Sequence, residues 1–278
     1  MVVSQKSSNF APNMQNSAQH IFSRLRTVYS EPEANELTRW MIEEQGDESA
    51  LLRLLRGEPV QYVFRHALWL GLDLLVTPDV LIPRPETAEL IAPICALKKD
   101  YPATLTSPVR LLDIGTGSGC IAIAIKQRCP RWEVSACDIS LSALSVAKEN
   151  AQRNNTDIRF LRCDILHDSP EGSFDIIVSN PPYICEQEKS TMESRVLDYE
   201  PASALFVPDN NPLLFYHRIA KVATTALRPN GHLFFEVNER FARHVADALI
   251  EYGFADVTVL QDMFGKNRFV TALWKQTN

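Results

Sequence analysis

The strongest constraint on the fold is a regular alternation of strand and helix patterns that begins after Pro108. Short apolar runs of the strand type are separated by longer segments with helical spacing. The expected strands are residues 109–114, 132–137, 158–161, 174–179, 232–237, 257–260 and 269–274. The expected helices are residues 120–128, 141–152, 212–227 and 240–252. Because parallel strands need helical crossovers, the alternation predicts a doubly wound, mostly parallel α/β sheet with helices on both faces.

The chain before this region has a helical pattern. Apolar residues recur every three or four positions between residues 17 and 56, which predicts three short helices. Ser30 and Asp47 are suited to begin the second and third helices, and Gly57 is suited to end the third.

A pair of short strands or a bulged hairpin is expected at residues 69–74, in a stretch rich in aromatic and aliphatic residues. We therefore expect a helical domain with a hairpin linker over residues 1–75 and an α/β domain over residues 76–278. The helical domain carries no catalytic constellation. Two roles stay open for it, a structural cap and the recognition of a partner.

The composition is that of a globular protein without a membrane span. Hydrophobic residues make up 45% and charged residues 22% of the 278 residues, and no run of about eighteen apolar residues occurs. The net charge of -6 and the pI of about 5.6 lack the basic character of proteins that grip many phosphates. We expect no membrane partner and no direct nucleic-acid partner.

The six cysteines contain no C-x-x-C pair, and several lie in apolar runs as small hydrophobic residues. Residues 1–19 lack the apolar core of a signal peptide and the arginines of a transit peptide. We therefore expect reduced thiols and a cytoplasmic location. The spacing of His, Cys, Asp and Glu does not suggest a metal site.

A glycine-rich loop follows the expected strand at residues 109–114. It consists of Gly115, Thr116, Gly117, Ser118 and Gly119, directly after Asp113-Ile114. Glycines let a ligand approach the backbone, and the next helix offers unpaired N–H groups. The loop lacks the Lys-Ser or Lys-Thr of a P-loop, and its third glycine comes one residue earlier than in the dinucleotide fingerprint. It predicts either nucleoside binding or a tight turn alone.

Two acids follow the next two strands. Asp138 ends the second strand, 19 residues beyond Gly119, where a carboxylate can accept hydrogen bonds from both hydroxyls of a ribose. Asp164 ends the third strand, where it either reads an adenine amino group or caps a turn. Because the carboxyl ends of parallel strands lie at one edge of the sheet, the loop and both acids should meet there.

The fourth strand, residues 174–179, stops abruptly at Asn180-Pro181-Pro182-Tyr183. Neither proline can donate to a sheet ladder, and each holds the residue before it extended. The strand must therefore end near Ser179 and present Asn180 at its tip. This rigid turn is either a site that holds a reacting group or a proline-rich loop of no chemical function.

A second proline-flanked segment, residues 82–87, reads Ile-Pro-Arg-Pro-Glu-Thr. Its prolines keep Arg84 out of helical space, and we expect a helix from residue 88 to residue 98. The charges of Arg84 and Glu86 are either solvated or ordered toward a site. Both are included as candidate substrate-binding residues.

These motifs together resemble class I methyltransferases that use S-adenosylmethionine and, among them, the release factor glutamine N5-methyltransferases. The similarity extends over nearly the whole chain and is carried by residues 57–62, 81–87, 113–119, 178–183 and 199–201. Methyltransferases that act on exocyclic amines of adenine or guanine have tetrapeptides similar to Asn-Pro-Pro-Tyr. The match becomes specific when the proline-arginine loop and the N-terminal helical unit are added.

The resemblance implies a Rossmann-like sheet of seven strands whose last strand is antiparallel. It implies S-adenosylmethionine as the cofactor and a peptide chain release factor as the protein substrate, with the target glutamine in a Gly-Gly-Gln sequence. We expect a monomer. The expected cofactor-binding residues are the glycine-rich loop, Asp138, Asp164, Ile165 and Asn180.

The expected catalytic residues are Asn180, Pro181 and Tyr183. The Asn180 side-chain oxygen and the Pro181 carbonyl would accept the two N–H bonds of the substrate amide, and Tyr183 would stack on its flat face. Pro182 completes the substrate-binding turn. The sequence shows no evident general base, and none is required before attack.

Two positions depart from the family pattern. Some relatives have an aromatic residue where this chain has Ile165, so its packing against adenine would be aliphatic. Many relatives have a glycine-containing run where residues 236–240 read Glu-Val-Asn-Glu-Arg. The second departure concerns the rim of the site.

Two other functions are compatible with parts of the pattern. Methylation of a nucleic-acid base amine is disfavoured by the acidic pI and by the lack of a basic patch with interleaved aromatic residues. A non-catalytic nucleoside-binding scaffold is disfavoured by the intact set of motifs. The glycine spacing also argues against a nicotinamide dehydrogenase.

Overall fold

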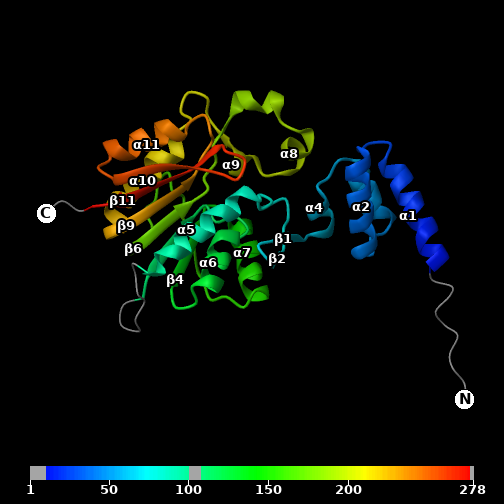
Figure 1. Cartoon of the computed structure of the whole chain (residues 1–278), viewed down its shortest axis with the longest axis horizontal. Helices are drawn as coiled ribbons and strands as arrows, with labels where there is room; N and C mark the ends of the chain where they lie inside the picture. The colour runs from blue at the N-terminus through cyan, green and yellow to red at the C-terminus, as the bar shows by residue number, and fades with distance from the viewer. Residues whose placement is uncertain (1–10, 100–107, 276–278) are drawn as a thin grey trace, which may run out of the picture. The chain divides into compact units, whose positions relative to one another are not determined.

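The computed structural model describes residues 11–99 and 108–275. The chain forms two compact units, Met1–Arg65 and His66–Asn278 (Figure 1). Residues 1–10, part of the segment in which we expect no signal peptide, lie outside the described residues. None of the helices within the described ranges combines the length and the apolar character that crossing a bilayer requires.

The first unit is helical, as the sequence predicts. Its helices are α1 (Ala11–Leu25), α2 (Glu31–Glu43), α3 (Glu48–Leu55) and the short α4 (Val60–Phe64), which the sequence did not predict. The Ser30 backbone N–H donates to Glu33 at 3.3 Å, and Asp47 accepts from the Ala50 N–H at 2.9 Å, so both expected N-caps are confirmed. The helices bury a small core of Leu25, Ala34, Met41, Leu51, Leu54 and Val63.

The second unit begins with the predicted hairpin, β1 (Ala67–Trp69) paired with β2 (Leu72–Leu74). The sequence placed this hairpin with the helical domain, whereas the structure groups it with the α/β unit. The reason is its contact with α7 (Leu141–Arg153). The Leu75 N–H donates to Asn150 Oδ1 at 2.6 Å, and Asn150 Nδ2 donates to the Leu75 carbonyl at 2.9 Å.

The main sheet of the second unit has the predicted Rossmann-like topology. Within the described residues it has seven strands in the order β10-β11-β9-β6-β3-β4-β5. They are β3 (Arg110–Ile114), β4 (Glu133–Asp138), β5 (Arg159–Arg162), β6 (Phe174–Ser179), β9 (Leu227–Glu236), β10 (Ala255–Gln261) and β11 (Asn267–Trp274). The last strand, β11, pairs antiparallel with both of its neighbours, and the other pairs are parallel. The expected sheet is confirmed.

Helices cover both faces of this sheet (Figure 1). One core contains Ile91 and Ile94 from α5 (Ile91–Ala96), the apolar residues of α6 (Cys120–Arg128) and every second residue of the central strands, such as Leu111. The other core joins α10 (Leu214–Ala226) and α11 (Ala242–Glu251) to the alternate strand residues, such as Leu112. Both faces of the central strands are thus buried, as expected of a doubly wound sheet.

The helix expected at residues 88–98 is broken into three pieces. It starts as a 3-10 turn, η1 (Glu86–Leu90), continues as α5 and ends as η2 (Leu97–Lys99). Pro93 has no N–H to donate to the Glu89 carbonyl, so an α-helix cannot run without interruption through this segment.

Between the tetrapeptide after β6 and the helix expected from residue 212, the sequence predicts no element, whereas the structure has five short ones there. They are β7 (Ile184–Cys185), η3 (Glu186–Thr191), α8 (Ser194–Tyr199), α9 (Ala202–Leu205) and β8 (Phe206–Val207). The two strands pair with each other in parallel and close the segment into a separate lobe beside the sheet. Elements this short lack a periodic pattern of their own.

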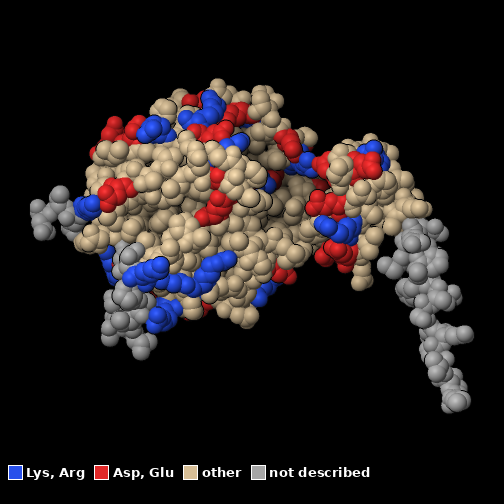
Figure 2. All heavy atoms as spheres, in the orientation of Figure 1, with Lys and Arg blue, Asp and Glu red and all other residues tan. Residues whose placement is uncertain are grey.

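Charges of both signs are interspersed over the visible surface of the second unit (Figure 2). A group of Lys and Arg side chains lies over the region of α6 and β4 in that view.

Candidate active site

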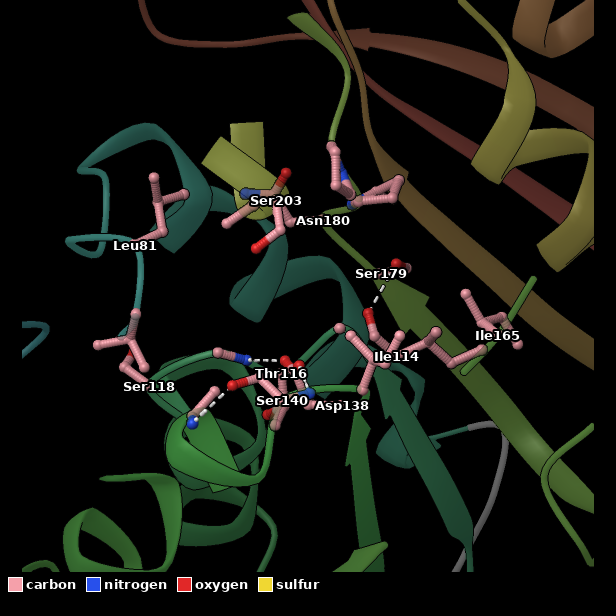
Figure 3. A pocket seen from close by; sticks show the side chains of 18 of the residues that line it. Leu81, Ile114, Thr116, Ser118, Asp138, Ser140, Ile165, Ser179, Asn180 and Ser203 are labelled. Carbon is pink, nitrogen blue, oxygen red and sulfur yellow. Dashed lines mark hydrogen bonds between the residues drawn. The ribbon is translucent and has the colours of Figure 1, made fainter. Parts of the chain in front are cut away.

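A cavity of about 290 Å³ opens at the carboxyl ends of β3, β4, β5 and β6. Its walls come from the turns after these strands, from residues 79–84 and from α9 and α10. Figure 3 shows Asn180 and Ser203 on one side of the cavity and Asp138 and Ser140 on the opposite side. The motifs predicted from four separate strands therefore meet at one edge of the sheet.

The glycine-rich loop after β3 is built to let a ligand approach its backbone. Gly115 and Gly117 have φ angles of +72° and +53°, and a Cβ at either position would meet no atom within 4 Å. Both glycines line the cavity, together with Thr116 and Ser118. Substitution at either glycine would therefore strain the backbone and place a side chain at the cavity wall.

Gly119 has a different role from the one the sequence predicts. It is not among the described residues that line the cavity. Its φ is +82°, and a Cβ there would lie 3.2 Å from the Cβ of Ala147 in α7 and 3.2 Å from Cδ1 of Ile123. Gly119 thus begins α6 and lets α6 and α7 pack closely.

Asp113 holds the glycine-rich loop from beneath. Its side chain is fully buried, and Oδ2 accepts from the Thr116 hydroxyl at 2.6 Å. Burial raises the pKa of Asp113 to about 7, and the nearby Asp138 charge acts in the same direction.

Asp138 presents a fixed carboxylate to the cavity. Its Oδ2 accepts from the Gly117 N–H at 2.9 Å, and its Oδ1 accepts from the Ser140 N–H at 2.9 Å. A carboxylate has about four acceptor sites, so each oxygen can accept one bond more. The group is thereby suited to bind a pair of neighbouring hydroxyls.

Asp164 lines the cavity and also caps a turn. Its Oδ1 accepts from the Leu166 N–H at 3.1 Å, and its Oδ2 lies 2.8 Å from His167 Nδ1. The hydrogen bond with His167 lowers the pKa of Asp164. Ile165, the next residue, is buried and lines the same part of the cavity.

The tetrapeptide after β6 is divided between the cavity and the core. Asn180, Pro181 and Pro182 line the cavity. The Ser179 hydroxyl donates to the Ile114 carbonyl at 2.7 Å, which ties the end of β6 to the end of β3. Tyr183 is not among the described lining residues and packs instead against the core beneath α10 and α11.

Behind Asn180 lies a buried carboxylate, Glu236, at the end of β9. Its Oε2 accepts from the Thr87 hydroxyl at 2.6 Å, and its Oε1 accepts from the Tyr183 hydroxyl at 3.2 Å. Burial raises the pKa of Glu236 to about 7, and Glu86 acts in the same direction, while the two hydrogen bonds and Arg268 oppose it.

The loop that carries Arg84 is tied to the segment after β6. Arg84 lines the cavity, and its guanidinium donates to Glu200 Oε1 at 2.6 Å. The other oxygen of the buried Glu200 accepts from the Ile82 N–H at 3.2 Å. Arg84 is thus ordered by an ion pair, whereas Glu86 is half-buried and is not among the described lining residues.

Comparison with known proteins decides the family. Residues 99–199 match the family model described as the methyltransferase small domain. The chain is 46% identical to the release factor glutamine methyltransferase of Bacteroides thetaiotaomicron, over 81% of this chain and 79% of that protein. It is 42% identical to the protein of the same name from Flavobacterium psychrophilum, over 80% of this chain and 78% of that protein. The chain belongs to the release factor glutamine methyltransferase family.

Solved structures with lower identity share the fold of this methyltransferase. A methyltransferase from Pyrococcus furiosus is 19% identical, covers 83% of this chain and 100% of its own, and gives a TM-score of 0.53. The hMettl16 catalytic domain in complex with the MAT2A 3'UTR hairpin 6 is 19% identical. The match covers 75% of this chain and 77% of that domain, with a TM-score of 0.57. At this identity the likeness concerns the class I methyltransferase fold alone.

Both departures from the family pattern have a clear place in this methyltransferase. Ile165 supplies an aliphatic wall to the cavity. Asn238 is buried, and its Nδ2 donates to the Tyr183 carbonyl at 3.3 Å while its Oδ1 accepts from the Arg240 N–H at 3.1 Å. The side chain of Asn238 therefore holds the rim together by hydrogen bonds.

Sequence reasoning missed Thr87 and Glu236 as parts of the site. Glu236 had a usable signal, because it is an acid at the end of an apolar strand, as Asp138 is. Thr87 had none beyond its place in the proline-arginine loop. Among the described residues, no group of three or more His, Cys, Asp or Glu side chains is arranged to hold a metal ion.

Proposed function

We propose that this chain transfers a methyl group from S-adenosylmethionine to the side-chain amide nitrogen, N5, of the glutamine in the Gly-Gly-Gln sequence of a peptide chain release factor. The observation that supports this most is the position of Asn180, whose amide faces the same cavity as the Asp138 carboxylate from the opposite side. One cavity thus offers an amide-binding end and a nucleoside-binding end.

The cavity fits S-adenosylmethionine by the chemistry of its lining. Asp138 would accept hydrogen bonds from the two ribose hydroxyls, and Ile165 would pack against the adenine. Asp164 would accept from the adenine amino group, and the open backbone of the glycine-rich loop would lie along the methionine part. When bound, the cofactor supplies a sulfonium methyl group that is already activated for transfer.

The acceptor end has to hold an amide, because a glutamine nitrogen is a weak nucleophile whose lone pair is delocalised into its carbonyl. Asn180 Oδ1 and the Pro181 carbonyl would accept the two N–H bonds of the substrate. These hydrogen bonds strengthen as positive charge develops on the nitrogen, and their rigid turn needs no reorganisation at that moment. Alignment of nitrogen with methyl supplies several kcal/mol more, roughly 7 to 11 at best.

Tyr183 and Arg84 are the other residues to which this proposal gives a role. The Tyr183 hydroxyl donates to Glu236, which fixes the ring directly after Asn180-Pro181-Pro182, and its contact with the substrate amide stays a prediction. Arg84 is held by Glu200 at the cavity wall, where it would contact the incoming polypeptide. We also propose that the helical unit, residues 1–65, recognises the release factor, and that the enzyme acts as a monomer in the cytoplasm.

The test is a transfer assay with labelled S-adenosylmethionine and recombinant release factors. The wild-type chain is expected to label a release factor, and Asn180→Ala to lose most turnover while it binds S-adenosylhomocysteine with nearly unchanged affinity. Label in a nucleic acid instead of the release factor would favour methylation of a base amine. Binding of the cofactor without transfer to any acceptor would favour the non-catalytic scaffold.

A further inference from the structure

Asn180 is linked to a buried carboxylate through one hydroxyl group. Asn180 Nδ2 lies 3.3 Å from Thr87 Oγ1, and Thr87 Oγ1 lies 2.6 Å from Glu236 Oε2. Thr87 and Glu236 are buried, with 3% and 0% of their surface exposed. The three side chains come from the turn after β6, from η1 and from the end of β9, so residues far apart in the chain meet at the acceptor end of the cavity.

The donors and acceptors of this chain of hydrogen bonds have one consistent direction. An ionised carboxylate can only accept, so the single proton of the Thr87 hydroxyl points to Glu236. The Thr87 oxygen is then left as an acceptor toward Asn180, and only the amide NH2 can donate to it. The nitrogen of the Asn180 amide is thereby fixed toward Thr87, and its oxygen is turned away from Thr87.

We propose that Glu236 and Thr87 are positioning residues that orient the Asn180 amide so that its oxygen, not its NH2 group, meets the substrate. The inference rests on the proposed function, because the orientation matters only if the acceptor is itself an NH2 group. With the amide reversed, two NH2 groups would face each other and the substrate nitrogen would lose an acceptor.

Protonation of Glu236 would remove this constraint. A protonated carboxyl can donate to Thr87, and the Thr87 proton is then free to point at the Asn180 oxygen, which reverses the amide. Thr87, Tyr183, Glu86 and Arg268 are the polar and charged groups that act on the Glu236 carboxyl, and the Tyr216 hydroxyl donates to its backbone carbonyl. Burial raises the pKa of Glu236 to about 7, so the switch falls near neutral pH.

The matched pair Thr87→Val and Thr87→Ser tests the relay. Valine keeps the shape but removes the hydroxyl, and we expect kcat to fall by roughly tenfold to a hundredfold, the range found when a hydrogen-bond partner that orients a metal ligand is removed. Serine keeps the hydroxyl and should restore most of that loss. The affinity for S-adenosylhomocysteine should be the same in both. Equal kcat values for the valine and serine variants would overturn the proposal.

The pH dependence of kcat distinguishes a positioning role of Glu236 from a purely structural one. In the wild type we expect kcat to rise through a pH of about 7 as Glu236 ionises. In Glu236→Gln, whose amide cannot ionise, this rise should disappear. A rise at the same pH in a folded Glu236→Gln protein would contradict the relay. Absence of any release factor methylation by the wild type would instead refute the proposed function.

A second, independent observation concerns the turn between β10 and β11. Two large apolar side chains at its tip, Met263 and Phe264, are 75% and 73% exposed. The turn is nevertheless rigidly held, because the buried Asp262 accepts from the Phe264 and Lys266 N–H groups at 2.9 and 3.0 Å and from Arg268 Nε at 3.1 Å.

This turn lies beside the acceptor end of the cavity. Because β10 runs parallel to β6 and β9, its carboxyl end is at the same edge of the sheet as Asn180. The Met263 N–H donates to Glu89 Oε1 at 3.2 Å, and Glu89 belongs to η1, which also supplies Thr87. On the other strand, Arg268 acts on the charge of Glu236.

We infer that Met263 and Phe264 form a docking surface for an apolar patch of the protein that carries the target glutamine. A glutamine side chain is short, so the polypeptide that delivers it must pass over the rim of the cavity. A rigid turn loses little conformational entropy on binding, and its two exposed apolar side chains gain most from burial. This inference also rests on the proposed function.

The double variant Met263→Ser/Phe264→Ser tests the docking surface by steady-state methylation of a full-length release factor. We expect KM for the release factor to rise at least about tenfold with kcat retained within a factor of about three. The control is Ile250→Ser, an exposed apolar residue, 58% exposed, at the end of α11 and thus at the opposite edge of the sheet. An unchanged KM in the double variant, or an equal rise in the control, would overturn the inference. No methylation by the wild type would count against the proposed function instead.

Discussion

At the scale of single residues, the proposed function assigns cofactor binding to Asp138 and amide binding to Asn180. Asp138 presents a carboxylate that is already held by two backbone N–H groups, and Asn180 presents an amide that is held through Thr87. They lie on opposite sides of the cavity, so a change at one should leave the function of the other measurable (Figure 3).

Asp138→Ala should weaken the binding of S-adenosylhomocysteine by roughly tenfold to a hundredfold, because hydrogen bonds to a charged acceptor are lost. Calorimetry measures this directly. Asp164→Ala in the same experiment distinguishes adenine binding from turn capping. If Asp164 only caps a turn, the affinity for S-adenosylhomocysteine should change by no more than a factor of about two. Unchanged affinity in Asp138→Ala would contradict the ribose role.

Much of the residue-level site could be predicted, because it lies in turns directly after strong strand patterns. Gly115, Gly117, Asp138, Asp164 and Asn180 all line the cavity as predicted. The placement of Tyr183 and Gly119 could not be predicted. Whether a residue next to a motif points into the cavity or into the core depends on packing against distant elements, which local pattern does not encode.

At the scale of elements, the sheet was predictable and the lobe between β6 and β9 was not. Each sheet strand carries its own apolar run, and each crossover helix has its own period. The lobe of short elements is held by contacts such as that of Glu200 with Arg84 and Ile82, which join segments more than a hundred residues apart in sequence. Such contacts leave no periodic signal.

Two glycines of the glycine-rich loop have different surroundings, since Gly115 lines the cavity and Gly119 lies between α6 and α7. A matched pair of substitutions can separate their effects. Gly119→Ala should lower the free energy of unfolding by about 1 to 3 kcal/mol, because it adds backbone strain and a contact of 3.2 Å with Ala147. Gly115→Ala adds similar strain, but its Cβ meets open space, so it should cost about 1 kcal/mol and weaken cofactor binding more. Chemical denaturation and calorimetry measure the two effects. Equal loss of stability and equal affinity in both variants would contradict this division.

At the scale of the whole molecule, two buried acids couple stability to pH. Burial raises the pKa values of both Asp113 and Glu236 to about 7 from their ordinary values of 3.8 and 4.5. At pH values between the unfolded and the folded pKa, the folded state binds more protons than the unfolded state. The stability that these two groups contribute is therefore present at low pH and is lost as pH rises through about 7.

The expected result is a fall in the free energy of unfolding between pH 5 and pH 8 that is smaller in Glu236→Gln. A shift from 4.5 to about 7 corresponds to about 3 kcal/mol for this one group. Asp164 and Asp262 have lowered pKa values and act only at more acidic pH. Urea denaturation at both pH values provides the measurement, and an equal fall in wild type and variant would contradict the raised pKa of Glu236.

The location of the transferred methyl group is the most direct test of the proposed activity. A recombinant release factor is incubated with the chain and labelled S-adenosylmethionine, digested and analysed by tandem mass spectrometry, beside a release factor whose Gly-Gly-Gln glutamine is replaced by alanine. One methyl group is expected on that glutamine side chain, with none in the alanine control and little with Asn180→Ala. Methyl transfer to another residue, or equal transfer to the alanine control, would contradict the proposed activity.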